Sequence, residues 1–162
     1  MSKPELSVLI LLENDAARLK NLCTGLLEKT CSQAVLLIDR DGQLLTWSGL
    51  LKDFDVVSLA SLTAGNMAAT DGLAHLLGES SFGSIFHQGD RESIFISNVG
   101  RRVFVVVIFN ERSSIALVRL RLDETLPGLL EIVDDILRKS SQSDLSSVGI
   151  TDHEIETLLG ED

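Results

Sequence analysis

One long stretch of the chain carries almost no charge, and it limits how the rest can fold. Residues 56–77, VVSLASLTAGNMAATDGLAHLL, contain one acid, Asp71, and neither Lys nor Arg. The stretch is typical of a single long helix. At about 100° per residue, leucines gather on one side of such a helix. We expect this leucine side to face the core of the domain: Leu59, Leu62, Leu73, Leu76 and Leu77.

The opposite side of the predicted helix consists of small or weakly polar residues. A solvated helix face normally carries several charges, whereas this side is smooth enough for another backbone to approach closely. A second face with a single acid and neither Lys nor Arg suggests a partner protein. The alternative is a helix enclosed in a large core of its own domain, for which a chain of 162 residues has few layers. The small-residue side comprises Val57, Ala60, Ser61, Ala64, Met67, Ala68, Asp71, Gly72 and His75.

Length and charge narrow the classes of partner. A chain of 162 residues has room for one domain and a tail, and such a domain buries roughly two thirds of its unfolded surface. The formal net charge of −10 argues against nucleic acid and anionic membranes, which would repel the molecule. The apolar run at residues 8–12 is too short to span a membrane. Cys23 and Cys31 are too few to form a zinc-binding site or a disulfide framework. These features predict a cytoplasmic protein that binds other proteins.

The remaining apolar patterns predict a mixed α/β domain. Residues 5–30 have the three- and four-residue spacing of an amphipathic helix. Residues 34–39 and 43–49 flank Arg40-Asp41-Gly42, and this pattern predicts a β-hairpin whose first strand, apolar on both faces, is central in a sheet. Three further hairpin-connected strands are expected at 84–89, 93–99 and 102–109, the last of them also central.

Residues 113–139 allow two interpretations. Val118, Leu120 and Leu122 alternate with Arg119 and Arg121, which is the period of a strand. The apolar residues from 126 to 137 have the period of a helix, with Pro127 among them, and proline costs about 3 kcal/mol inside a helix. The pattern alone leaves open a strand followed by a helix, or one helix kinked at Pro127.

The end of the chain changes in composition. Residues 140–149, SSQSDLSSVG, are typical of a flexible linker, so the domain is expected to span residues 1–139. Residues 150–162 begin with Thr151 and Glu154 in a capping box and encode a helix too short to be stable alone. We expect this segment to dock in a groove, and the alternative is that it packs on its own domain. Its apolar residues are Ile150, Ile155, Leu158 and Leu159.

The sequence lacks a catalytic constellation. The three histidines are far apart, and no phosphate-binding glycine motif or nucleophile motif is present. The start of a calcium loop at Asp39 fails at its later positions, which are Leu44 and Leu50. We therefore expect no metal and no cofactor, and we interpret the chain as an interaction module and not an enzyme.

Several segments together resemble a known family. The DRDGQLL hairpin, the helix SLASLTAGNMAATDGLAHLLGE, the run RVFVVVIFNERSSIALVRLRL and the acidic apolar tail resemble roadblock (dynein light-chain roadblock type) domains of the MglB-like branch. The resemblance implies a five-stranded antiparallel sheet with the first and last helices on one face and the central helix on the other. It also implies that residues from 114 to about 139 form one helix.

The resemblance further implies a function. MglB-like proteins are homodimers, joined by their central helices and third strands, that bind a Ras-like small GTPase of the MglA type and activate it without an arginine finger. The contacting residues would be those of the small-residue side other than His75, and the tail would dock elsewhere on the GTPase. The setting would be bacterial cell polarity and gliding motility, with the protein concentrated at a cell pole. The alternative is a passive scaffold that localises a GTPase or another complex without changing its turnover.

Overall fold

The computed structural model describes residues 13–51 and 56–147, which form three helices and five strands. The elements follow the predicted order and the sheet is antiparallel, so the expected fold class is confirmed. The expected helix residues 5–12 lie outside the described residues. In order, the elements are α1 (Glu13–Thr30), β1 (Ala34–Asp39), β2 (Leu44–Gly49), α2 (Val56–Leu76), β3 (Ser84–Gln88), β4 (Ser93–Val99), β5 (Val103–Phe109) and α3 (Ile115–Ser147).

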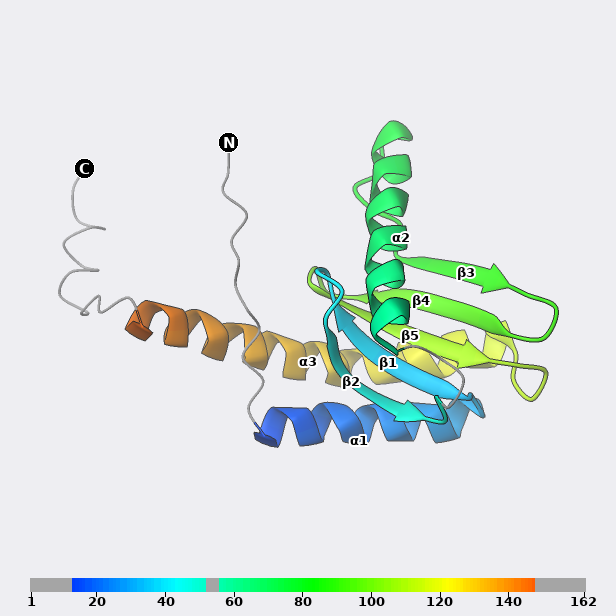
Figure 1. Ribbon diagram of the computed structural model, residues 1–162, viewed down its shortest axis with the longest axis horizontal. Coiled ribbons are helices and arrows are strands. Elements are labelled where there is room, and N and C mark those ends of the chain that lie inside the picture. Colours follow the sequence, from blue (N-terminus) through cyan, green and yellow to red (C-terminus); the bar gives the residue numbers. More distant parts are fainter. Residues whose placement is uncertain (1–12, 52–55, 148–162) are drawn as a thin grey trace.

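The sheet has the strand order β2-β1-β5-β4-β3 (Figure 1). Every residue of β1 and of β5 is buried, and the two strands pair in the register Leu36 with Val106. This confirms that the two strands that are apolar on both faces lie in the interior of the sheet, because helices cover them on both sides. Within the described residues, the outer edge of β3 is paired with no strand.

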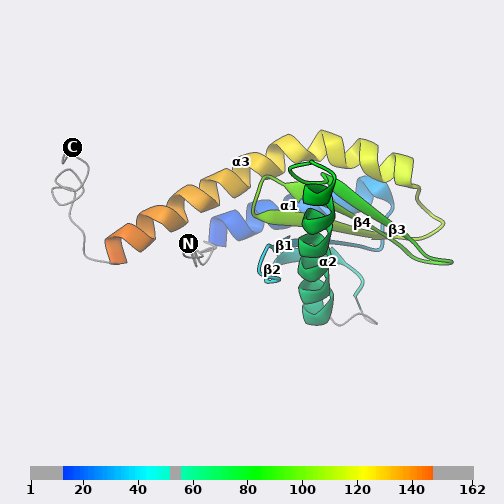
Figure 2. The same ribbon diagram turned by 90° about the horizontal axis from the view of Figure 1, so that it is seen from above.

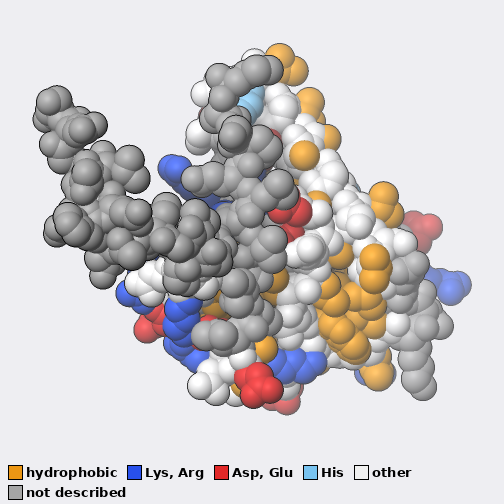
Figure 3. Space-filling view, turned by 60° about the vertical axis from the view of Figure 1, so that its left-hand side comes forward, with side chains coloured by type: hydrophobic (Ala, Val, Ile, Leu, Met, Phe, Trp, Pro, Cys, Tyr) orange, Lys and Arg blue, Asp and Glu red, His pale blue; other side chains and the backbone are white. Residues whose placement is uncertain are grey.

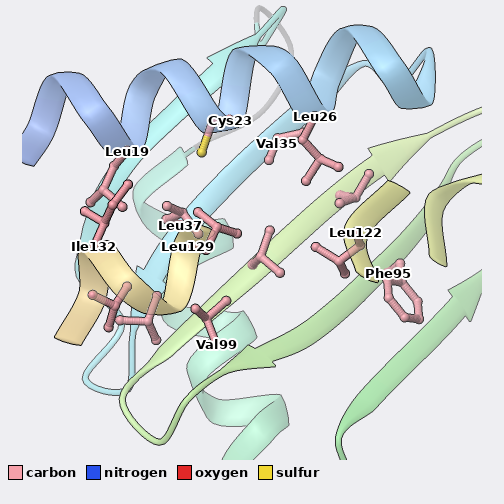
Figure 4. Close-up of a cluster of buried hydrophobic side chains, with 14 of the residues drawn as sticks. Leu19, Cys23, Leu26, Val35, Leu37, Phe95, Val99, Leu122, Leu129 and Ile132 are labelled. Carbon is pink, nitrogen blue, oxygen red and sulfur yellow. The ribbon is translucent and has the colours of Figure 1, made fainter. Parts of the chain in front are cut away.

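The helices form layers on opposite faces of the sheet. Figure 2 shows α1 and α3 on one face and α2 on the other, as the family resemblance implied. The larger core lies under α1 and α3, where Leu19 and Cys23 meet Leu37 and Leu129 (Figure 4). Burial raises the pKa of the Cys23 thiol to about 12, so it stays protonated and unreactive. The smaller core lies under α2 and includes Ile38, Phe104 and Val106.

The structure resolves the ambiguous segment as one helix. Val118 and Leu122 are buried against the sheet while Leu120 is exposed, which is helical spacing, and the helix is continuous through Pro127.

The predicted linker is wrong for residues 140–147, which continue α3. Serine favours linkers because its hydroxyl competes for backbone groups. Here the Ser141 and Ser143 hydroxyls donate to the carbonyl oxygens of Leu137 and Ser140, both at 3.0 Å, and so bond within the helix. Residues 148–162, including the docking residues of the tail, lie outside the described part of the chain.

Ion pairs hold α3 along α1. The carboxylate of Asp15 is almost fully buried and lies 3.1 Å from Lys139 Nζ. Arg18 Nη1 lies 3.4 Å from Asp135 Oδ2, and hydrogen bonds from Arg18 and Arg138 hold the pKa of Asp135 below its usual range. These contacts fix the part of α3 that follows Pro127.

Gly49, at the end of β2, provides a test of the fold. Its φ is +111°, and a Cβ there would lie 2.2 Å from the Gln33 carbonyl oxygen. We expect Gly49→Ala to lower the free energy of unfolding in urea by about 2–4 kcal/mol. The matched control is Gly25→Ala in α1, where a Cβ meets nothing within 4 Å. This substitution should raise the free energy of unfolding by about 1 kcal/mol, because alanine favours the helix more than glycine does. Equal effects of the two substitutions would contradict the packing of Gly49 against Gln33.

Candidate functional site

Helix α2 does not lie on the sheet in the predicted orientation, because the side that faces the sheet lies between the leucine side and the exposed part of the small-residue side. Ala60, Thr63, Met67 and Ala74 are buried, and Leu59 is half-buried. The prediction that the leucine side faces the core is therefore wrong for four of its five members. Their exposed fractions are 72% for Leu62, 59% for Leu73, 83% for Leu76 and 74% for Leu77.

The reason for the different orientation is the close approach of the β1–β2 turn. Gly42 has a φ of +88°, and a Cβ there would lie 3.1 Å from Ser61 Cα and 3.5 Å from Ala64 Cβ. A leucine at position 64 would collide with this turn. Small residues let α2 lie close to the turn and the sheet, and Met67 fills the remaining space in the smaller core.

The predicted contact residues do not form one surface. Ala60 and Met67 are buried and cannot reach a partner, while Ala64 and Asp71 are half-buried beside the β1–β2 turn. The exposed members lie on one side of α2, together with Gly65, which the sequence-based prediction missed. Its position in the 100° progression, about 20° from Gly72 and about 40° from Ser61, was the available signal. We call this surface the small-residue flank: Val57, Ser61, Gly65, Ala68 and Gly72.

A second exposed surface of α2 is apolar. We define the leucine flank as Leu62, Leu73, Leu76 and Leu77. Figure 1 shows the C-terminal end of α2 projecting beyond the sheet at β3, and Figure 3 shows hydrophobic side chains along this projection with no Lys or Arg among them. Asn66 Nδ2 lies 3.1 Å from His87 Nε2 of β3, which connects the helix to the edge strand.

The two surfaces contain no catalytic or metal-binding geometry. Among the residues that the structure describes, no group of three His, Cys, Asp or Glu side chains could hold a metal ion. Asp39, the first residue of the rejected calcium loop, instead accepts hydrogen bonds from the backbone N–H groups of Asp41 and Gln43, both at 2.9 Å.

The model of the Roadblock/LC7 domain matches residues 19–109, from α1 to the end of β5. The chain belongs to the Roadblock/LC7 family. No curated protein sequence matches it.

Several solved structures of MglB proteins are similar to this Roadblock/LC7 chain. Myxococcus xanthus MglB is 40% identical with a TM-score of 0.74, over 79% of this chain and 96% of that one. The gliding protein MglB of Thermus thermophilus is 31% identical with a TM-score of 0.74, over 83% of this chain and 99% of that one. An MglB with a tetrameric arrangement is 30% identical, covers the same shares and has a TM-score of 0.75.

Helices in the described part of this Roadblock/LC7 chain do not combine the length and apolarity that crossing a bilayer requires.

The packing of the β1–β2 turn on α2 distinguishes two neighbouring alanines. Ala64 faces Gly42, whereas Ala68 is exposed. We expect Ala64→Arg to lower the free energy of unfolding in urea by about 1–3 kcal/mol, because the arginine must displace the turn. Ala68→Arg, the matched control, should change it by no more than about 0.5 kcal/mol. If both substitutions cost the same, Ala64 is not packed against the turn.

Proposed function

We propose that this chain is a homodimeric activator of a Ras-like small GTPase of the MglA type, with no catalytic site of its own. The observation that carries the proposal is the cation-free exposed surface of α2 on a fold similar to MglB. Its two flanks differ in chemistry, which suits two different protein contacts. The setting we propose is bacterial cell polarity and gliding motility, with the protein concentrated at a cell pole.

The leucine flank and the edge of β3 support contact with a second copy. A free strand edge is a liability unless it is paired, and a two-fold axis lets the same edge pair with itself. Joining two β3 strands would bring the projecting end of each α2 over the sheet of the other copy. There it can cover the half-buried Ile85 and Ile94, which belong to the smaller core. The arrangement buries apolar surface of both copies.

The small-residue flank supports contact with the GTPase. Small side chains allow close approach of a switch segment, and α2 itself contains neither Lys nor Arg that could serve as an arginine finger. Arg112 follows β5 and so lies at the opposite end of the sheet from the β1–β2 turn. Activation then comes from binding the hydrolysis-competent switch conformation more tightly than the ground state. The GTPase itself supplies the phosphate and magnesium chemistry.

The tail adds a second contact in this proposal. Ile150, Ile155, Leu158 and Leu159 would dock on the GTPase away from the platform and raise its affinity through high effective concentration. The second candidate function is a passive scaffold, since the same surface of α2 could hold a GTPase without favouring either switch conformation.

GTP turnover tests the proposal. We expect this chain to accelerate hydrolysis by an MglA-type GTPase from the same genome, and Ala68→Arg to remove the acceleration, because it places bulk and an unpaired charge at a close contact. The matched control is Ala116→Arg, at an exposed position in α3, which should retain full acceleration. Binding without acceleration by the unsubstituted chain would favour the scaffold, and full acceleration by Ala68→Arg would contradict the small-residue flank as the platform.

Sedimentation tests the homodimer. We expect the unsubstituted chain to sediment as a dimer at micromolar concentration and the double variant Leu62→Ser, Leu73→Ser to be a folded monomer. Both leucines are exposed in a single copy, so their replacement should leave its fold intact. The control is Leu120→Ser, on the exposed side of α3, which should remain dimeric. A dimer that survives the double substitution would contradict this interface.

A further inference from the structure

The β1–β2 turn is a rigid element packed directly on the helix that we propose contacts the GTPase. Asp39 Oδ1 accepts the two backbone N–H groups of Asp41 and Gln43, and the Asp39 carbonyl accepts the N–H of Gly42 at 3.1 Å. With three hydrogen bonds to one buried residue, the turn has a fixed shape. Gly42 then places it against the backbone of α2 at Ser61.

Arg40 makes a second contact between this turn and α2. Its Nη1 lies 3.4 Å from Asp71 Oδ2, and its guanidinium carbon lies 5.6 Å from the centre of the Phe104 ring. The backbone N–H of Arg40 donates to the Arg102 carbonyl at 3.0 Å, which attaches the same residue to the β4–β5 turn. Arg40 is therefore held by the sheet at its backbone and by α2 at its side chain.

The two contacts lie far apart along the helix. Ser61 and Asp71 are separated by about 15 Å of helix at 1.5 Å per residue. Contacts at two points define the direction of the turn along α2 better than one contact would. Asp71 Oδ1 is shielded from solvent and has no hydrogen-bond partner among the described residues, so Arg40 is the cation that the structure places beside this carboxylate.

The ion pair between Arg40 and Asp71 adds little to the stability of the fold, but it orients the β1–β2 turn relative to α2. The Arg40 side chain is 44% exposed, and an ion pair of this kind contributes little to the free energy of folding. Its geometric effect is to hold Asp41 and Gly42 beside the small-residue flank.

We infer that Arg40 and Asp71 are positioning residues that make the β1–β2 turn part of the GTPase-binding surface. This inference rests on the proposed function. The small-residue flank forms one side of the surface and the turn forms the other, and the pair sets the width between them. The partner of this combined surface is the Ras-like GTPase, and the leucine flank is not part of it.

The test compares Arg40→Ala, Asp71→Asn and the double variant with the unsubstituted chain. Binding to a GTP-loaded MglA-type GTPase from the same genome is measured together with turnover as a function of chain concentration. We expect each single variant to raise the dissociation constant and the half-saturating concentration about 3–10-fold. Maximal turnover and melting temperature should stay unchanged, and the double variant should be no weaker than the singles because both remove one contact.

Matched variants separate position from charge. Arg101→Ala removes an exposed arginine of the neighbouring turn and should bind like the unsubstituted chain. The exchange Arg40→Asp with Asp71→Arg should recover affinity that either reversal alone loses. Gly42→Ala, whose Cβ would push the turn from α2, should weaken binding in the same direction as Arg40→Ala.

The outcomes distinguish this inference from the proposed function. If the unsubstituted chain binds and activates the GTPase while Arg40→Ala and Gly42→Ala do the same at equal concentrations, the inference is wrong and the proposed function stands. A fall in melting temperature that accounts for the lost binding would also overturn it, because the role would then be merely structural. If the unsubstituted chain does not bind the GTPase, both fail together.

Discussion

The close packing of α2 on the sheet and on the β1–β2 turn determines most of what this molecule can do. Gly42 lies against the helix backbone, so the side chain that faces it must be small, and Ala64 meets that requirement. The volume between helix and sheet is then filled by Met67 and by residues of the sheet. Because small residues occupy the inward side of α2, its leucines are left on the outside.

Exposed leucines in a single copy carry a free-energy cost in water that a second surface can relieve. Leu73, Leu76 and Leu77 of the leucine flank lie at the end of α2 that projects beyond β3, next to a strand edge that is unpaired in the described chain. One contact can therefore satisfy both the helix and the edge. The small-residue flank lies on another side of α2, which leaves it open for the partner that we propose.

The sequence allowed good prediction of the sheet and poor prediction of how α2 is oriented. Strands β1 and β5 were predictable because apolar residues on both faces require burial on both sides. The leucine side was placed wrongly because the rule that large apolar residues face the core takes no account of the β1–β2 turn, which lies against α2 at Ser61 and Ala64. Val118, Leu120 and Leu122 alternate as in a strand although they belong to a helix. The pattern was ambiguous because Leu120 is an apolar residue that is exposed. Position 42 was identified as a turn glycine, yet its contact with α2 depends on tertiary packing that no local pattern encodes.

Cysteine labelling of the two flanks tests most directly whether they serve different partners. In a Cys31→Ser background the remaining Cys23 is buried, and its pKa near 12 keeps it unreactive. Leu73→Cys should then react slowly whether or not the GTPase is present, because the second copy covers it. Ala68→Cys should react fast until the GTP-loaded GTPase is added and slowly afterwards. Fast labelling of Leu73→Cys in the assembled protein, or labelling of Ala68→Cys that the GTPase does not slow, would contradict the account.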